Sequence, residues 1–534
     1  MYDLGRAYTY ISQSFDGTAV PALIEYIKIP NLSPAFNGGN VNEPETEIVV
    51  NMFVKWVESQ NLKDSKVEVR RLPNRTPLIL IDVPATNGYS GRDSILLYGH
   101  LDKQPPFEGW DEGTGPYTPV IKNGRLYGRG GADDGYAIFG SVLALKAIHD
   151  QGLPHARAVI MIEACEESGS PDLPAHLQQL TSSGILQDVS LVICLDSGAG
   201  NYDTLWITTS LRGLLMVKVK VASLTEGVHS GNGGGICSDT FRVFRQLLSS
   251  IEDERTGQIV QDFQVDIPNR TIAQNSKTCS MLGDNVWKGF PHVGDYPMNP
   301  ERSNEDRALD RGWRASLTIT GIDGLPPTST GGNVIRPATT FKISMRLPPT
   351  YDHNKALDRL KYRFDGACPR DCRVEFLEPM TAKGWSAPEI EMWLEDAFKK
   401  SSNILFQTEP CHAFEGGSIP FLGMLQDMFP QAQWYVESPT EYIIVPSCVT
   451  GVLGPHSNAH GPNEFLDLEY CKKIIACVSN IIAAHSARGY FGDRGDTGKL
   501  PDVSSAESRV GGAHEDKLVN IKAASHTTET LASA

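Results

Sequence analysis

Short apolar runs alternate with segments of helical periodicity along the first two hundred residues. Residues 78–83, 94–98, 158–162 and 191–195 are runs rich in Val, Ile and Leu, whereas the apolar residues of 137–148 recur with helical spacing. Continuous apolar strands that alternate with helices are typical of a parallel sheet covered on both faces. The pattern therefore predicts an α/β fold with a mostly parallel, helix-covered sheet.

A different pattern begins near residue 208. The expected elements follow in the order strand, helix, strand, strand, helix, strand, at residues 215–221, 238–251, 316–320, 340–346, 353–364 and 373–377. This is the order of a ferredoxin-like βαββαβ unit. A stretch at about 253–312, rich in Asn, Asp, Pro and Gly, interrupts the unit and is expected to be irregular.

After residue 385 the chain returns to mixed helices and strands, with helices expected near 388–401 and 466–486. We therefore expect a first domain split into residues 1–207 and 386–490, with a second domain inserted at 208–385. Residues 491–534 carry few large apolar side chains, and this composition predicts a disordered tail.

Length, charge and cysteine content narrow the possible functions. A chain of 534 residues is too long for one ordinary core, and its net charge of −16 argues against nucleic acid or an anionic membrane as a partner. No apolar run approaches the roughly 18 residues of a membrane span, and the N-terminal residues lack a secretory hydrophobic stretch, so we expect a cytoplasmic protein. The ten cysteines are scattered, and only Cys368 and Cys372 lie close together, too few for a four-ligand zinc knuckle.

Metal-type side chains follow the apolar runs. His100, Glu166, Glu167 and Asp196 each come one to five residues after such a run, and ligands gather at the carboxyl ends of parallel strands. The successive intervals are 33 residues from His100 to Asp133, 34 from Asp133 to Glu167 and 29 from Glu167 to Asp196. These intervals match a strand–helix–strand repeat, so each ligand is expected at an equivalent strand end.

The motifs can be interpreted in terms of metal binding, and two of them also have a purely structural interpretation. His100 and Asp102 share one side of an extended segment, which suits a metal-bound His oriented by a carboxylate or an ordinary surface pair. Asp133 lies in a Gly-rich loop before a helix, where it could bridge two metals or cap the helix. Glu166 and Glu167 should point to opposite faces of an extended chain, and their repulsion would be relieved by a cation.

Several motifs together resemble one known family. They are Tyr98-Gly-His-Leu-Asp102, Gly130-Gly-Ala-Asp-Asp134, Glu166-Glu167, Asp196 and His460. With them the chain resembles the dinuclear zinc family of aminoacylases, carnosinases and glutamate carboxypeptidases. The match to its cytosolic non-specific dipeptidase branch is closer, through Gly99–Pro106, Gly109-Trp110, Pro116–Pro119 and Glu415–Pro420. The resemblance covers about residues 20–487.

The resemblance implies a site with two divalent cations, which we expect to be zinc, although manganese or cobalt would also suit such ligands. His100 and Asp196 match the ligands of one metal, Glu167 and His460 those of the other, and Asp133 the carboxylate that bridges them. Glu166 matches the general base and Asp102 the residue that orients His100. The family also has a cis peptide bond after the bridging aspartate.

The resemblance further implies that the inserted domain is a lid through which a homodimer forms. His229 matches a His that reaches into the neighbouring subunit's site. Asn333 and Arg346 match contacts to the substrate's carboxylate end, although Arg346 could also be an exposed strand residue. Gly417 and Ser418 match the substrate loop.

The implied activity is hydrolysis of dipeptides or short peptides with a free C-terminal carboxylate, by a metal-bridged hydroxide with Glu166 as base. An N-acyl amino acid deacylase would use the same ligands, and a catalytically silent binding scaffold is a third possibility. A serine or cysteine hydrolase is disfavoured because no Gly-x-Ser-x-Gly motif accompanies a plausible base.

Two segments depart from the family pattern. The family's dipeptidases have Lys after the aspartate pair, whereas this chain has Gly135 and Tyr136. Residues 433–448 make the segment before the last His longer than expected, which could displace His460 or bulge at the surface.

Overall fold

The computed structural model describes residues 2–86, 88–417, 419–428 and 445–488. All of these belong to the first of two compact units, residues 1–489. The predicted tail at 491–534 lies outside the described residues. No described helix has the length and apolar character needed to cross a membrane.

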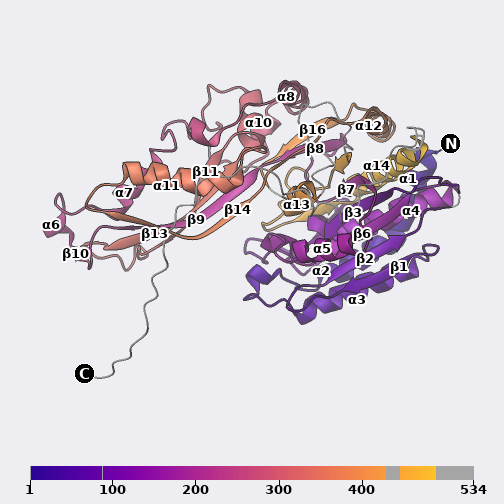
Figure 1. The fold of residues 1–534 in the computed structure, drawn as a ribbon, viewed down its shortest axis with the longest axis horizontal. Coiled ribbons are helices and arrows are strands. Elements are labelled where there is room, and N and C mark those ends of the chain that lie inside the picture. Colours follow the sequence, from indigo (N-terminus) through magenta and orange to yellow (C-terminus); the bar gives the residue numbers. More distant parts are fainter. Residues whose placement is uncertain (1, 87, 418, 429–444, 489–534) are drawn as a thin grey trace, which may run out of the picture. The chain divides into compact units, whose positions relative to one another are not determined.

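One six-stranded sheet has the strand order β1-β2-β6-β3-β7-β17, with β1, β2, β6, β3 and β7 labelled in Figure 1. Its strands are β1 (Lys66–Arg70), β2 (Leu78–Val83), β3 (Ser94–His100), β6 (Arg157–Glu163), β7 (Val189–Cys194) and β17 (Ser447–Val449). Strands β6, β3, β7 and β17 are parallel, whereas β1 and β2 add an antiparallel edge. The predicted mostly parallel α/β sheet is confirmed.

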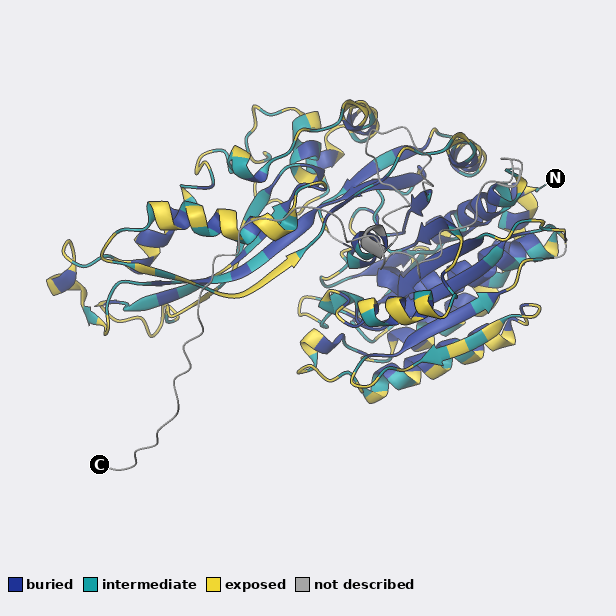
Figure 2. Cartoon of the chain, viewed as in Figure 1, coloured by how far each residue is buried: buried dark blue, intermediate teal, exposed yellow. Residues whose placement is uncertain are grey.

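Both faces of the sheet are buried, which explains why its strands are continuously apolar (Figure 2). Ile95 and Leu97 pack into one core, whereas Leu96 and Tyr98 pack into another on the opposite face. Six helices supply the first core: α1 (Leu4–Ser14), α2 (Val20–Ile27), α3 (Pro44–Ser59), α4 (Tyr136–Asp150), α12 (Met392–Leu405) and α14 (Leu468–Ala487). The second core includes α5 (Leu173–Ser182) and α13 (Pro420–Met428).

A separate antiparallel sheet has the order β11-β13-β9-β14. Its elements along the chain are β9 (Gly213–Ala222), α7 (Thr240–Leu248), β11 (Ser316–Asp323), β13 (Ala338–Leu347), α11 (Ala356–Ala367) and β14 (Arg373–Ala382). Helices α7 and α11 pack on one face, where Val217, Val219 and Val221 of β9 are buried. Lys218 and Lys220 alternate with these valines and are only partly buried, which explains the alternating pattern in the sequence.

The stretch expected to be irregular contains three helices, so that prediction is wrong. They are α8 (Asn269–Leu282), α9 (Asn285–Lys288) and α10 (Asn304–Gly312). The buried face of α8 includes Thr271, Asn275 and Thr278, and the Asn275 side chain donates a hydrogen bond to the carbonyl of Glu305. Because much of this face is polar, the helix lacks the apolar periodicity by which helices are recognised in a sequence.

Two three-stranded sheets and one two-stranded sheet complete the described fold. One three-stranded sheet contains β8 (Trp206–Leu211), β15 (Trp385–Ser386) and β16 (Cys411–Glu415), and the other contains β4 (Val120–Lys122), β5 (Arg125–Tyr127) and β18 (Phe465–Asp467). A separate two-stranded sheet pairs β10 (Val228–His229) with β12 (Val334–Ile335). The β5–β18 pair matters for the site because it joins the chain before Asp133 to the chain after His460.

Candidate metal centre

Three neighbouring parallel strands end beside one another and carry most of the predicted ligands. His100 is the last residue of β3, Asp196 follows β7, and the turn Glu166–Ser168 follows β6. Because β6, β3 and β7 are adjacent and parallel, these side chains lie at one edge of the sheet.

Asp133 and His460 reach the same edge from loops. Asp133 lies in the turn Gly131–Gly135 directly before α4, after the β4–β5 hairpin, and its peptide bond to Asp134 is cis, as the resemblance implies. His460 lies in the segment between β17 and β18. The expectation that every ligand occupies an equivalent strand end is therefore wrong for Asp133. The interval that precedes it contains a hairpin and not a strand–helix repeat.

Asp133 lies between two groups of ligands. Its Oδ1 atom is 3.2 Å from Nε2 of His100, and its Oδ2 atom is 3.2 Å from Nε2 of His460. His100 Nε2 is also 3.9 Å from Oδ2 of Asp196, and His460 Nε2 is 3.3 Å from Oε2 of Glu167. The structure thus brings the five predicted ligands together as two half-sites that share Asp133.

These separations fit donor atoms around a common cation. Zinc bonds of about 2.0–2.1 Å at tetrahedral angles place two donor atoms roughly 3.3 Å apart. Donor atoms of His100, Asp133 and Glu167 all lie within 4.8 Å of one another, and so do those of His100, Glu166 and Asp196. The residues present therefore fit divalent cations, and the contacts of Asp133 with both imidazoles allow two of them to share its carboxylate.

Burial and mutual repulsion disfavour the charged forms of Glu166, Glu167 and Asp196. Burial and the nearby Asp196 raise the pKa of Glu166 well above its ordinary value, and burial and Asp133 raise the pKa of Glu167 to about 8. Burial also raises the pKa of Asp196 to about 6, although His100 opposes the shift. A divalent cation bound among these groups would offset the cost of their charged forms.

Asp102 contacts both His100 and the turn that carries the two glutamates. Its Oδ1 atom is 3.4 Å from Nδ1 of His100. The backbone N–H groups of Glu166 and Glu167 donate to its two carboxylate oxygens at 3.1 and 3.0 Å. Asp102 can therefore orient the imidazole, as expected, and it also fixes the turn.

The turn itself differs from the expectation. Residues Glu166–Ser168 form a single 3₁₀ turn and not an extended segment, so the interpretation that Glu166 and Glu167 point to opposite faces is wrong. Both side chains lie among the ligand groups, each within a cluster that contains His100.

Sequence reasoning missed three side chains that support the site. The Gln104 amide donates to Oε2 of Glu167 at 2.5 Å, and Arg129 pairs with Glu464 at 2.9 Å. Gln104 is visible in the sequence only as part of a motif. The signal for Glu464 is weak: it is a carboxylate four residues after His460, in a turn that contains Gly and Pro.

The residues expected to bind substrate lie on other elements. His229 of β10 is exposed and pairs with Val334 of β12, and its Nδ1 atom accepts a hydrogen bond from the N–H of Gly231. The carbonyl of Asn333 accepts from the N–H of Ser230. In the described part of the chain, no hydrogen bond or ion pair joins His229 or Asn333 to the metal-type ligands. Their assignment stays a prediction.

Arg346 of β13 lies near a second arginine beside the predicted substrate loop. Burial and the neighbouring Arg346 lower the pKa of Arg212 to about 9, and Nε of Arg212 donates to the carbonyl of Gly416 at 3.3 Å. Gly417, the next residue, is exposed, and Ser418 lies outside the described residues. The positive charge next to Gly416 suits a carboxylate ligand.

The structure shows the surroundings of Gly135 and the position of His460 after the long segment, the two points at which the sequence departs from the family pattern. A Cβ atom at position 135 would lie 2.2 Å from Cε1 of Tyr26 and 2.7 Å from the carbonyl oxygen of Gly130, so only glycine fits there. Most of the long segment 433–448 lies outside the described residues, but Ser447–Val449 pairs with β7 as an edge strand. The segment does not displace His460, which lies 3.2 Å from Asp133.

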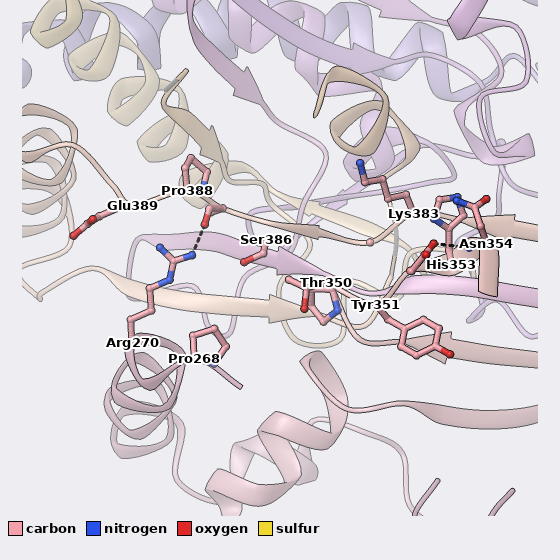
Figure 3. A pocket seen from close by; sticks show the side chains of 14 residues that line it. Pro268, Arg270, Thr350, Tyr351, His353, Asn354, Lys383, Ser386, Pro388 and Glu389 are labelled. Carbon is pink, nitrogen blue, oxygen red and sulfur yellow. Dashed lines mark hydrogen bonds between the residues drawn. The ribbon is translucent and has the colours of Figure 1, made fainter. Parts of the chain in front are cut away.

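A cavity of about 860 Å³ lies apart from the predicted ligands (Figure 3). Residues 349–354, which follow β13, and residues 383–384, which follow β14, line it together with residues 386–389. The guanidinium of Arg270 donates across it to the carbonyl of Ala387 at 2.8 Å. None of the predicted ligands or substrate residues lines this cavity, so it is distinct from the metal centre.

Two imidazoles and four carboxylates gathered at one edge of a parallel sheet are typical of hydrolases that use two divalent cations. The model of peptidase family M20/M25/M40 matches residues 96–484, and the chain belongs to this family. This confirms the resemblance drawn from the motifs.

The chain is similar to several dipeptidases. It is 24% identical over 433 residues to the cysteinylglycine-S-conjugate dipeptidase of Corynebacterium striatum, which covers 77% of this chain and 85% of that protein. It is 26% identical over 355 residues to the Cys-Gly metallodipeptidase DUG1 of Saccharomyces cerevisiae, which covers 63% of this chain and 70% of that protein.

Solved structures share the fold. The dipeptidase Dug1p of Saccharomyces cerevisiae matches with a TM-score of 0.68 and 21% identity, over 91% of this chain and 99% of that chain. Human carnosine dipeptidase 1 matches with a TM-score of 0.67 and 20% identity, over 90% of this chain and 99% of that chain.

The two half-sites make a prediction about metal stoichiometry. We expect the wild-type chain to bind two zinc ions and His460→Ala to lose tight binding of one. Removing a direct ligand should lower the affinity for that ion at least about 100-fold, because even the loss of an outer partner typically lowers metal affinity 10–100-fold. Calorimetric titration of the metal-free protein with zinc measures both the number of bound ions and their affinity. His456→Ala removes an exposed imidazole from the same loop and should bind two ions. Equal stoichiometry in the two variants would contradict the assignment of His460.

Proposed function

We propose that this protein is a metallodipeptidase that hydrolyses the peptide bond of dipeptides or short peptides with a free C-terminal carboxylate. The observation that carries the proposal is Asp133, whose two oxygens face His100 and His460, with Glu166 beside the first half-site. Membership of a peptidase family and the similarity to named dipeptidases support the substrate class.

Five side chains would hold two divalent cations, with zinc as the proposed metal. His100 and Asp196 would bind one, Glu167 and His460 the other, and Asp133 both. When bound, such cations lower the pKa of water toward neutrality and polarise the scissile carbonyl. Asp102 keeps the His100 ring and the glutamate turn in place for this geometry.

Glu166 is the proposed general base. Burial and the neighbouring Asp196 raise the pKa of its carboxyl group, which brings the group closer to the pH at which it must accept and release a proton. Glu166 takes a proton from the attacking water and delivers it to the leaving nitrogen, so that the amine departs neutral.

Most of the proposed substrate contacts come from residues 208–385, which we propose form an inserted lid between residues 1–207 and 386–490. Arg346 would bind the terminal carboxylate with its planar guanidinium, supported by Asn333 and by the loop with Gly417 and Ser418. We propose that the lid forms a homodimer and that His229 of one subunit donates to the oxyanion in the site of its partner. A cytoplasmic location is part of the same proposal.

A panel of substrates tests this function directly. We expect the zinc-loaded protein to cleave dipeptides, to lose the activity on chelation and to regain it with added zinc. N-acetyl amino acids lack the free amine and should be cleaved much more slowly. Preference for the acetylated compounds would establish a deacylase, and inactivity toward both classes with two zinc ions bound would establish a binding scaffold.

Glu166→Gln separates catalysis from metal binding. Glutamine keeps the size of the side chain but cannot accept the proton, so turnover should fall about 100- to 10,000-fold. Because Glu166 is not one of the five proposed ligands, the variant should still bind two zinc ions. Single-turnover rates and metal analysis give the two readouts, and a near-normal rate would remove Glu166 as the base.

Mixing two inactive variants tests the role of His229 across the dimer. We expect His229→Ala to lower turnover about 100- to 1,000-fold, as the loss of an oxyanion donor typically does. A mixed dimer of His229→Ala with Glu166→Gln would contain one complete site. After subunit exchange the mixture should therefore recover about a quarter of the wild-type activity.

Recovery requires that His229 act in the partner's site. If His229 acted within its own subunit, each chain of the mixed dimer would carry one defect in its own site. The mixture would then stay as inactive as the separate variants. Mass analysis of differently tagged subunits confirms that exchange has occurred.

A further inference from the structure

A buried ion pair joins the two loops that carry Asp133 and His460. Nη1 of Arg129 lies 2.9 Å from Oε2 of Glu464, and the two residues have relative exposures of 1% and 0%. Arg129 precedes the turn with Asp133, and Glu464 follows His460 by four residues. The pair therefore links the shared ligand to a ligand of the second half-site.

Glu464 fixes the backbone of the turn that carries the bridging carboxylate. It accepts hydrogen bonds from the N–H groups of Gly130 at 3.0 Å, Ala132 at 3.2 Å and Asp133 at 3.3 Å. Gly130 has a φ of 83°, a left-handed conformation that allows successive amides to converge on one anion. One carboxylate thus sets the position of the Asp133 main chain.

Arg129 fixes the opposite loop. Its Nη2 atom donates to the carbonyl of Gly461, the residue after His460, at 2.5 Å. Its guanidinium carbon also lies 5.8 and 5.9 Å from the rings of Phe107 and Trp110, within the distance of a cation–π contact. The planar fork of arginine lets one side chain bind Glu464 and Gly461 at the same time.

We propose that Arg129 and Glu464 are positioning residues that keep Asp133 and His460 at the separation the second cation requires. The inference rests on the metal centre of the proposed function. Buried ion pairs are often no more stabilising than apolar side chains of the same size, because both charges must be desolvated. What this pair supplies is a fixed geometry between two loops that belong to no common strand.

Two conservative variants test the proposal. Arg129→Lys keeps the charge but replaces the fork with a single ammonium, which cannot hold Glu464 and Gly461 in the same arrangement. Glu464→Gln keeps the size but replaces one acceptor oxygen with a donor that faces backbone N–H groups. We expect each variant to weaken the binding of one of the two zinc ions about 10- to 100-fold, as mutation of the outer partners of metal ligands typically does. Each variant should also lower kcat more than KM.

The matched control is Asp93→Asn. Asp93 pairs with Arg488 at 2.6 Å in another part of the fold and contacts none of the proposed ligands. This variant should lower the thermal midpoint and bind both zinc ions as the wild type does. Zinc affinity is measured by titrating the metal-free proteins against a competing chelator, and circular dichroism follows their folding. For a variant that folds only with metal, the rate of zinc loss from the loaded protein to the chelator replaces the titration.

Each outcome decides one claim. Weaker binding or faster loss of one zinc ion in Arg129→Lys and Glu464→Gln, but not in Asp93→Asn, supports the positioning role. Unchanged zinc binding with a lowered thermal midpoint would overturn it, because the pair would then be structural only. If the wild type binds two zinc ions but cleaves no dipeptide, the proposed activity fails while the positioning role stands. If the wild type binds no zinc, both fail.

Discussion

The repulsion among four buried carboxylates is the constraint on which the rest of the site depends. Asp133, Glu166, Glu167 and Asp196 meet at one edge of the sheet, where two unit charges 4 Å apart repel by about 4 kcal/mol at the effective dielectric of a protein surface. Burial adds a desolvation cost, which the raised pKa values of the last three express. Folding of the edge and binding of cations are therefore linked, because each cation offsets charges that the fold brings together.

The ligands are held in two different ways. His100, Asp196 and the glutamate turn follow directly from β3, β7 and β6, so the backbone ladder of the sheet positions them. Asp133 and His460 lie on loops, which the ladder does not reach. There the β5–β18 ladder joins the chain on either side, and two side chains complete the link: Glu464 accepts from the Asp133 main chain, and Arg129 donates to the residue after His460. Because Asp133 and His460 lie on loops and not on strands, the buried Arg129–Glu464 pair is needed to hold them at the sheet edge.

The sequence predicts the parts that local patterns encode. The apolar run 78–83 coincides with β2, and His100 lies at the end of β3 as expected. Helix α8 was missed because its buried face is largely polar, and the position of Asp133 was misread because a hairpin occupies the interval before it. The Arg129–Glu464 pair spans 335 residues, so no local pattern announces it. The proposed substrate residues remain predictions because their proposed partners belong to substrate or to a second subunit.

The departure at Gly135 shows how the centre tolerates a changed neighbour. Tyr26 packs where a side chain at position 135 would lie. The chain carries a buried lysine elsewhere, at Lys103, whose ammonium lies 3.9 Å from the centre of the Tyr26 ring and donates to the carbonyls of Tyr26 and Ile29. Burial lowers the pKa of Lys103 well below its ordinary value, and the nearby Glu464 opposes that shift. The Lys103 side chain thus lies beside Gly130 in the loop that Glu464 fixes, although it comes from the loop after His100 and not from the residue after the aspartate pair.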